Sequence, residues 1–334
     1  MHSDGRALHG GGKRLLLHVS KYGVYIILLA MVIFLSIMSP RFLTVSNIMN
    51  ILQQAAPLGI AVIGMVFVLS IGGTDISVGQ VMFLTAVVAA NILESYRGRG
   101  LANTPQALLA VWGGGLAVGL IFGALNGLLC ARFGMVPFIA TLATQSIARG
   151  IGLSISRGSV YRMNELSVIS QSTLGSIKFP VVTIIQLVLL LIFSFVFYST
   201  PLGRHTEAVG NDSLAAKHIG IKVVRVKFFA FVLCGLTASI GAMLLAGQIA
   251  NVYSNFANGN EFLVISGAVL GGTSLSGGRG NLIPGALVGI VLIQTIMNGL
   301  LLMDASPYAY TIIRGLIIFV AVILDSVAYK GELR

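Results

Sequence analysis

The stretch SIGGTDISVGQ, residues 70–80, decides how the rest of the sequence is interpreted. It separates two apolar runs, residues 60–69 and 81–90, and it places glycines and a carboxylate where a membrane helix would carry large apolar side chains. Glycine permits the dihedral angles at which a helix breaks, and irregular backbone at membrane depth is tolerated only where it is buried or lines a cavity. The break and Asp75 therefore need a structural or functional reason.

The composition around this stretch predicts a membrane protein. Of 334 residues, 56% are hydrophobic and 9% are charged, whereas a soluble domain carries about 25% charged residues. A helix needs roughly 20 mostly apolar residues to cross a bilayer, and a β-barrel would show alternating segments of about ten residues. The long apolar runs predict an all-α, polytopic helical membrane protein with about ten membrane segments and broken helices. The segments are 22–38, 48–70, 76–93, 106–130, 136–155, 181–198, 226–246, 261–272, 281–302 and 308–327.

The charges predict how these segments are oriented. The formal net charge is +11, and in a membrane protein an excess of Lys and Arg marks the cytoplasmic loops. The basic face with aromatics that a nucleic-acid-binding protein would carry is not seen, so no nucleic-acid partner is expected. With the N-terminus inside and ten crossings, residues 1–20 and 331–334 are cytoplasmic tails, and residues 21–330 form a single transmembrane domain. The basic residues that fall on the outer side include Arg97, Arg99, Arg157 and Arg162.

The sequence lacks the motifs of an enzyme. No Lys is followed by Ser or Thr, so the phosphate-binding GxxxxGK[ST] loop is absent, as are the HExxH and GxSxG motifs. Cys130 and Cys234 lie singly in apolar runs, without the spacing of a metal site or a disulfide framework. We therefore expect no catalytic residue, no metal and no cofactor on this chain, and an energy source on another subunit.

A stripe of glycines predicts close packing between helices. Glycine recurs every four residues from 115 to 127, and the spacing is repeated at Gly285 and Gly289. Residues four apart share one helical face, and glycine lets a second backbone approach it closely. We expect these glycines to pack helices together and not to bind a ligand.

The opening stretch has a second copy later in the chain. GGTDISVGQ at 72–80 aligns with GGTSLSGGR at 271–279, which pairs Gly72 with Gly271, and five of nine positions match. Paired interruptions in corresponding parts of a membrane chain are typical of a transport pathway. The sequence therefore predicts an internal repeat, parallel or inverted, whose breaks lie on the pathway. The pathway candidates in the breaks are Gly72, Gly73, Thr74, Asp75, Ser77, Gly271, Gly272, Thr273 and Ser274, and polar candidates near them are Gln53, Gln54, Asn126, Thr141 and Asn298.

Asp75 has three alternative roles at this stage. It caps the helix that begins near Ile76, because Asp is a favoured N-cap and complements the helix dipole. It forms an ion pair with a basic residue elsewhere in the chain. Or it contacts a substrate hydroxyl, because an ionisable group at membrane depth is a candidate for function.

A polar loop lies between the sixth and seventh segments. It reads TPLGRHTEAVGNDSLAAKHIGIKVVRVKF, residues 200–228, and the predicted orientation places it in the cytoplasm. Its alanines favour a short helix over residues 207–219, and Gly220 is placed to end that helix. The loop is expected to lie outside the packed helices, either as a solvated basic loop or as a docking element.

Several motifs in this loop and elsewhere resemble one family. EAVGNDSLAAKHIGI, from Glu207, resembles the cytoplasmic coupling loop of permease subunits in ATP-binding-cassette importers of the ribose and simple-sugar class. It departs from the family pattern at Asn211-Asp212-Ser213, where Gly-Asn-Pro-Glu is common. GGTDISVGQVM, from Gly72, is similar to the family's Gly-x-Asp-Leu-Ser-Val-Gly, with Ile76 for Leu. FLTVSNIMNILQQAAP from Phe42, NGLLCARFGMVPFIATLATQSIARGI from Asn126 and GAVLGGTSLSGGRG from Gly267 extend the resemblance over roughly residues 20–330.

The resemblance implies a transmembrane permease subunit that imports a monosaccharide or a related small polyol across a bacterial inner membrane. It implies cassette ATPase subunits carrying ATP-Mg, a second permease copy or paralogue, a periplasmic sugar-binding protein and membrane lipid as partners. The coupling loop would span about 202–226, and the family pattern falls on Ala208, Gly210, Ala215, Ala216, Gly220 and Ile221. The residues expected to couple to the ATPase are Glu207, Gly210, Ala215, Ala216 and Gly220. The alternatives are a stand-alone secondary carrier or facilitator for a small polar solute, and an intramembrane enzyme.

Overall fold

The computed structural model describes residues 9–332, and the prediction of an all-α chain is confirmed. The described residues also include four strands of two residues each, which pair as β1 with β4 and as β2 with β3. The helices are α1 (His9–Met38), α2 (Val45–Ser70), α3 (Val78–Arg97), α4 (Pro105–Ala131), α5 (Pro137–Ser156), α6 (Asn164–Ser170), α7 (Val181–Ser199), α8 (Pro201–Asn211), α9 (Ser213–His218), α10 (Val223–Ile249), α11 (Asn260–Leu270), the π-helical turn η1 (Leu282–Ala286), α12 (Leu287–Leu302) and α13 (Pro307–Glu332). The strands are β1 (Tyr161–Arg162), β2 (Thr173–Leu174), β3 (Phe179–Pro180) and β4 (Asn251–Val252).

Each of the ten predicted segments contains a helix, but the helices differ in length. Among the described residues, seven are long and apolar enough to cross a membrane, and Gly23–Met38, Asn260–Leu270 and Tyr308–Ile323 are shorter apolar helices. At 1.5 Å per residue, the 11 residues of α11 extend about 16 Å, roughly half of a bilayer core. The structure therefore supports a multi-pass membrane protein, while the figure of about ten membrane segments stays a prediction.

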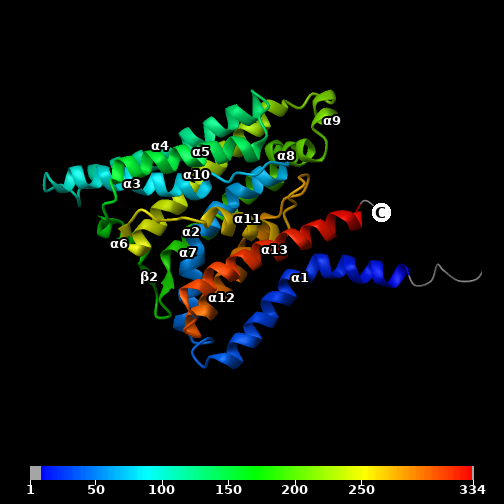
Figure 1. Ribbon diagram of the computed structural model, residues 1–334, viewed down its shortest axis with the longest axis horizontal. Helices are drawn as coiled ribbons and strands as arrows, with labels where there is room; N and C mark the ends of the chain where they lie inside the picture. Colours follow the sequence, from blue (N-terminus) through cyan, green and yellow to red (C-terminus); the bar gives the residue numbers. More distant parts are fainter. Residues whose placement is uncertain (1–8, 333–334) are drawn as a thin grey trace, which may run out of the picture.

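Figure 1 shows the two ends of the molecule along its longest axis. Helices α3, α4, α5 and α10 lie along the longest axis, with the α3–α4 connection at one end and α8–α9 at the other. The N-terminal end of α1 and the C-terminal end of α13 point towards the α8–α9 end. The two ends of the described chain thus lie on the same side as the polar loop. The first eight residues of the predicted N-terminal tail lie outside the described residues, and α1 already begins at His9.

Helix α2 forms the centre of the bundle because it is apolar on every side. All of its residues from Ala55 to Ser70 are buried, as expected for a helix without a polar face. It packs against α10, α7, α11 and α12. Thr44 caps its first turn by accepting a hydrogen bond from the backbone N–H of Asn47 at 3.3 Å.

The glycine stripe of α4 packs directly on the backbone of α10, as predicted. A Cβ atom on Gly119, Gly123 or Gly127 would lie closer than 3.0 Å to a backbone oxygen of α10. The second predicted pair behaves in the same way, because a Cβ on Gly285 or Gly289 would meet the backbone around α11. Both contacts are possible only because glycine has no side chain. They hold together helices that lie next to the two breaks.

Candidate functional site

The two breaks end their helices with the same hydrogen-bond pattern. After α2, Gly72 has a φ of +72°, its N–H donates to the oxygen of Leu69 at 2.8 Å, and the N–H of Gly73 donates to Val68 at 3.0 Å. After α11, Gly272 has a φ of +93° and makes the corresponding bond to Val269 at 2.8 Å. A left-handed glycine with two such bonds is a common helix C-terminus.

The pattern shifts the predicted alignment by one residue at this point. Gly72 corresponds to Gly272, whereas the sequence alignment pairs it with Gly271. The alignment is right again three residues later, because the N–H of Ser77 donates to Asp75 Oδ1 at 2.9 Å and the N–H of Ser276 donates to Ser274 Oγ at 3.2 Å. The two breaks share these local turns, and the larger internal repeat stays a prediction.

The breaks meet each other at the end of the molecule that carries α8 and α9. The N–H of Gly278 donates to the oxygen of Ser70 at 2.9 Å, which joins the second break to the end of α2. A Cβ on Gly277 would lie 2.8 Å from the nitrogen of Gly72. We refer to this contact, together with the part of α8 that lies against it, as the break junction. It consists of residues 70–72, 207–211 and 276–280.

Helix α8 completes the break junction through its last turn. A Cβ on Gly210 would clash with the oxygen of Ser70 and the nitrogen of Gly278. The N–H of Gly280 donates to Glu207 Oε1 at 3.2 Å. The predicted loop therefore does not lie outside the packed helices, since part of it touches both breaks at once.

The loop contains two helices where one was predicted, so the helix expected over 207–219 is wrong. Helix α8 ends at Asn211 and α9 begins at Ser213, and Asp212 between them is extended, with a φ of −155°. Asp212 Oδ1 accepts hydrogen bonds from the N–H groups of Leu214 at 2.8 Å and Ala215 at 3.0 Å. An aspartate that caps a new helix competes with continuing the old one. In the sequence, the departure from the family pattern at residues 211–213 indicated this interruption between α8 and α9.

Helix α9 presents one face to solvent and one to its own chain. Leu214 is 69% exposed and Ile219 is 76% exposed, and Ala215 is exposed beside them. Ala216 is 3% exposed, so of the two alanines only Ala215 is available to a partner. The predicted end of the helix at Gly220 is confirmed by its φ of +87°.

A groove lies beside α9, between α8 and the start of α10. Its volume is about 440 Å³. Apolar walls from Leu202, Ile219 and Phe229 are joined by the basic side chains of Lys222 and Arg225. The groove and the exposed face of α9 together form a surface of mixed apolar and basic character at this end of the molecule.

Asp75 lies in a buried polar cluster that closes the first break. Its Oδ1 accepts hydrogen bonds from the backbone N–H of Ser77 at 2.9 Å and from the Ser77 hydroxyl at 2.6 Å. Asn126 Nδ2 lies 3.5 Å from both carboxylate oxygens and donates to the Ser77 hydroxyl oxygen at 2.9 Å. These partners are neutral, so the structure does not support the ion pair. Asp75 accepts from Ser77, the residue before α3, and Ser77 itself has no side-chain capping bond, so capping of the helix by Asp75 stays a prediction.

The cluster continues onto α5 and is sealed from the surface. Thr144 donates to Asn126 Oδ1 at 2.7 Å, and the N–H of Ile76 donates to Thr141 Oγ1 at 3.1 Å. Asp75, Asn126 and Thr141 are each no more than 2% exposed. Contact of these residues with a solute has no support in this arrangement and stays a prediction.

The remaining pathway candidates are scattered and make structural contacts. Gln53 Nε2 donates to the oxygen of Ser170 at 3.2 Å. Asn298 and Asn47 exchange two side-chain hydrogen bonds of 2.9 Å each, and both are buried. Thr273 Oγ1 accepts from the N–H of Asn281 at 3.1 Å. The structure therefore brings together the break glycines and the loop, and it gathers Asp75, Ser77, Asn126 and Thr141 in a second cluster, but it places Gln53 and Asn298 elsewhere.

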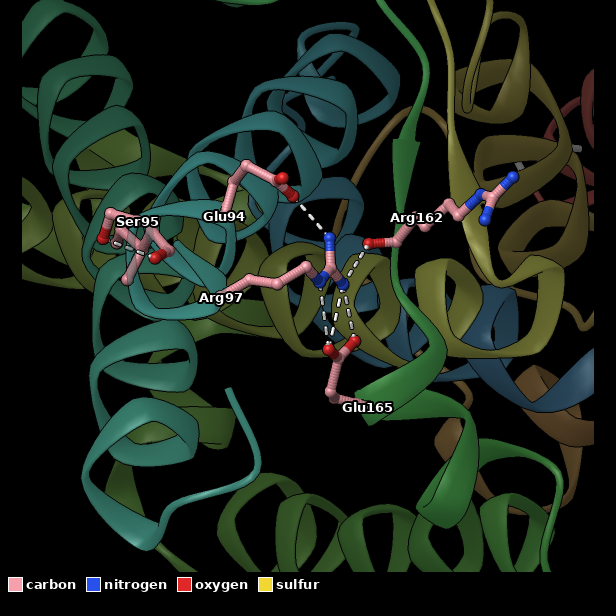
Figure 2. A network of polar contacts seen from close by, with 6 residues as sticks. Glu94, Ser95, Arg97, Arg162 and Glu165 are labelled. Atoms are coloured by element: carbon pink, nitrogen blue, oxygen red, sulfur yellow. Dashed lines mark hydrogen bonds and ion pairs between the residues drawn. The ribbon is translucent and has the colours of Figure 1, made fainter. Parts of the chain in front are cut away.

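An ion-pair network that the sequence analysis missed lies at the opposite end of the molecule. Figure 2 shows Arg97, at the end of α3, pointing its guanidinium towards Glu165 of α6 and Glu94 of its own helix. The Arg97 guanidinium donates to both carboxylate oxygens of Glu165, at 2.8 and 2.9 Å, and to the oxygen of Arg162 in β1 at 3.2 Å. The topology prediction put Arg97 on the outer side. In the structure its charge is paired with the carboxylates of Glu94 and Glu165.

Comparison with known proteins gives one consistent result. The family described as branched-chain amino acid transport system / permease component matches residues 47–322. The ribose import permease protein RbsC of Bacillus subtilis is 34% identical over 311 residues, which cover 92% of this chain and 93% of that protein. The L-arabinose transport system permease protein AraH of Escherichia coli is 31% identical over 312 residues, covering 93% and 92%. No solved structure has significant similarity to the chain.

Proposed function

Because the chain belongs to the family of branched-chain amino acid transport system permease components, it is a permease subunit of an ATP-binding-cassette importer, and we propose that it carries a monosaccharide or a related small polyol. The relatives named for ribose and L-arabinose transport support this class of solute. The chain is a transport subunit and not an enzyme, because ATP hydrolysis in such importers belongs to partner subunits.

The break junction is the observation that carries the proposed mechanism. An importer must convert movement of its ATPase into movement of its helices. Here α9 projects at one end, and α8 connects it to both breaks through Gly210 and Glu207. Packed interfaces of this kind shift between discrete arrangements and do not deform continuously. A displacement of α9 by the ATPase would therefore reach the ends of α2 and α11 together.

The orientation of the chain in the membrane and its partners are also part of the proposal. The cytoplasmic side is the end that carries α9, where Arg204, Lys217, Lys222 and Arg225 lie, as the positive-inside rule requires. Both ends of the described chain point to that side (Figure 1). The chain makes about ten crossings of a bacterial inner membrane. Its partners are a second permease copy or paralogue, ATPase subunits with ATP-Mg, a periplasmic sugar-binding protein and lipid.

The proposal is tested by reconstituting the chain in liposomes with its ATPase and a sugar-binding protein. We expect uptake of radiolabelled D-ribose or L-arabinose that requires ATP, and no uptake when the ATPase is omitted. Equal uptake with and without the ATPase would instead identify a stand-alone carrier. Transport of amino acids with no transport of either sugar would overturn the assigned class of solute.

A further inference from the structure

A second group of polar side chains, drawn from four apolar segments and from the turn before α11, is not explained by the break junction. The guanidinium of Arg149 on α5 donates to Gln80 Oε1 on α3 at 3.2 Å, and Gln80 Nε2 donates to Asn258 Oδ1 at 3.1 Å. Arg314 on α13 donates to the backbone oxygen of Asn258 at 3.3 Å. Glu261, in the first turn of α11, completes the group, which we name the polar band.

Glu261 is held in the polar band without a full set of hydrogen bonds. It is 2% exposed, and its Oε2 atom is buried and has no hydrogen-bond partner among the described residues. A Cβ on Gly79 would collide with that oxygen, so the glycine leaves the space that the carboxylate occupies. A Cβ on Gly259, two residues before Glu261, would collide with the guanidinium of Arg314, so this cation lies beside the same turn.

Other unpaired polar atoms lie on the elements of the same band. The buried Nε of Arg314 and the buried Oε1 of Gln145, one turn before Arg149 on α5, also lack partners among the described residues. Buried polar groups are nearly always paired, and exceptions call for a specific explanation. These atoms are buried in the single chain, so they show an incompletely paired interior and not a surface that a solute reaches directly.

The polar band lies at membrane depth and reaches the surface of the single chain. Arg149 follows Pro137, the first residue of α5, by 12 residues, which is about 18 Å along a helix of about 30 Å. Asn258 is exposed, and Arg149 and Arg314 are half-buried. Ionisable side chains at this depth face a bundle interior or a water-filled cavity and not lipid. The exposed edge of the band therefore needs a polar neighbour.

We propose that the polar band is one wall of the translocation pathway, that a second permease copy completes the pathway opposite it, and that the band binds the hydroxyl groups of a neutral sugar in transit. A sugar hydroxyl both donates and accepts hydrogen bonds, which matches the exposed amide of Asn258 and the half-buried guanidinium groups of Arg149 and Arg314. This inference rests on the proposed function and moves the solute contact from the breaks to Asn258, Arg149 and Arg314. Gln80 and Glu261 are buried behind these side chains and position them.

The first test asks whether the exposed edge meets water or lipid. Both native cysteines are buried, so Asn258→Cys gives this chain a single accessible thiol, and labelling is measured on the permease band in the assembled transporter. We expect a membrane-impermeant thiol reagent to label it during ATP-driven turnover, and D-ribose or L-arabinose supplied on the binding protein to slow the labelling at least threefold. Leu191→Cys, on a 63% exposed position of α7, is the lipid-facing control and should stay unlabelled. Equal inertness of both thiols would overturn the pathway, and labelling that neither sugar slows would overturn the sugar contact.

The second test removes the buried charge while keeping the shape of the side chain. Glu261→Gln should lower ATP-dependent sugar uptake at least tenfold, with unchanged co-purification of the ATPase. Glu94→Gln, on an exposed side chain at the outer end of α3, is the matched control and should transport normally. Wild-type uptake by Glu261→Gln would overturn the inference and leave the proposed function intact. Absence of sugar uptake by the wild-type transporter would overturn the proposed function itself. If Glu261→Gln does not fold, the same uptake measurement is made on Asn258→Ala, whose side chain is exposed. Lower uptake is again expected, and wild-type uptake would overturn the inference.

Discussion

Asp75 is the acceptor that holds the first turn after the α2 break. Asp75→Asn keeps one oxygen for the N–H of Ser77, so we expect folded yield near the wild-type level. Asp75→Leu leaves the N–H and hydroxyl of Ser77 without their acceptor in a buried site, which costs about 1–3 kcal/mol for each unsatisfied group. Its folded yield, measured by size-exclusion chromatography in detergent, should fall severalfold.

Glu94→Leu is the control for Asp75→Leu, because it removes an exposed carboxylate and should leave the yield unchanged. Full yield and transport in Asp75→Leu would contradict the capping role. Normal yield with complete loss of transport in Asp75→Asn would instead show that the charge acts on the pathway.

Gly210 is the residue at which the loop touches both breaks. Gly210→Ala places a methyl group against the oxygen of Ser70 and the nitrogen of Gly278, and neither backbone atom has room to move freely. Overpacking of this kind costs about 1–3 kcal/mol. We expect a lower thermal unfolding midpoint and weaker coupling of ATP hydrolysis to sugar uptake.

Gly150→Ala is the matched control for Gly210→Ala, since a Cβ at position 150 meets nothing within 4 Å. The unfolding midpoint is measured by scanning fluorimetry of the purified chain. If Gly210→Ala and Gly150→Ala have the same unfolding midpoint and uptake rate, the prediction is contradicted. The break junction would then accommodate a shift of α8.

Helix α9 is expected to serve as the docking element for the ATPase, and its two alanines should respond differently to substitution. Ala215→Arg places a bulky charge on the exposed face, so it should block co-purification of the ATPase while folded yield stays normal. Ala216 faces its own chain and is 3% exposed, so Ala216→Arg should lower folded yield first. The measurements are the co-purified ATPase per permease and the permease yield.

The same result in both alanine variants would contradict the orientation of α9. Normal ATPase binding in Ala215→Arg would assign docking to another surface, of which the groove at Lys222 and Arg225 is the nearest.

Arg97 joins α3 to α6 and β1 at the end of the molecule opposite α8 and α9. Arg97→Gln removes the paired contact with Glu165, whose side chain is 11% exposed. Partly exposed ion pairs contribute on the order of 1 kcal/mol, and salt screens them. We expect a fall of a few degrees in the unfolding midpoint at low salt, and a smaller difference at 1 M salt. Arg99→Gln, on an exposed side chain nearby, should show no change, and a salt-independent effect of Arg97→Gln would contradict the electrostatic explanation.

Across the whole molecule, features that depend on local sequence were predictable. The apolar runs predicted the long helices, and the glycine spacing predicted the contact of α4 with α10. Gly220 was correctly predicted to end a helix. Each of these follows from residues within one or two turns, where propensity and periodicity act directly.

Features that depend on distant backbone atoms were not predictable in the same way. The bond from Gly278 to Ser70 joins two main-chain groups, and main-chain groups carry no residue identity that a sequence pattern could reveal. The polar band did leave a signal, because Arg149 and Arg314 each interrupt an apolar segment and Gly79 leaves space for Glu261. The glycine pairs directed the prediction to the two breaks, where contact with a solute was one of three alternatives for Asp75.

The α4–α10 contact also constrains how this protein can be repaired by second-site mutation. At Gly152 an added methyl group would strike the ring of Phe83, so Gly152→Ala can be suppressed by a smaller residue at position 83. At Gly123 the methyl group would strike the backbone oxygen of Phe231, and no change of side chain removes a backbone oxygen. A genetic selection for restored growth on the sugar should therefore recover second-site revertants of Gly152→Ala at codon 83, but revertants of Gly123→Ala almost entirely at codon 123 itself.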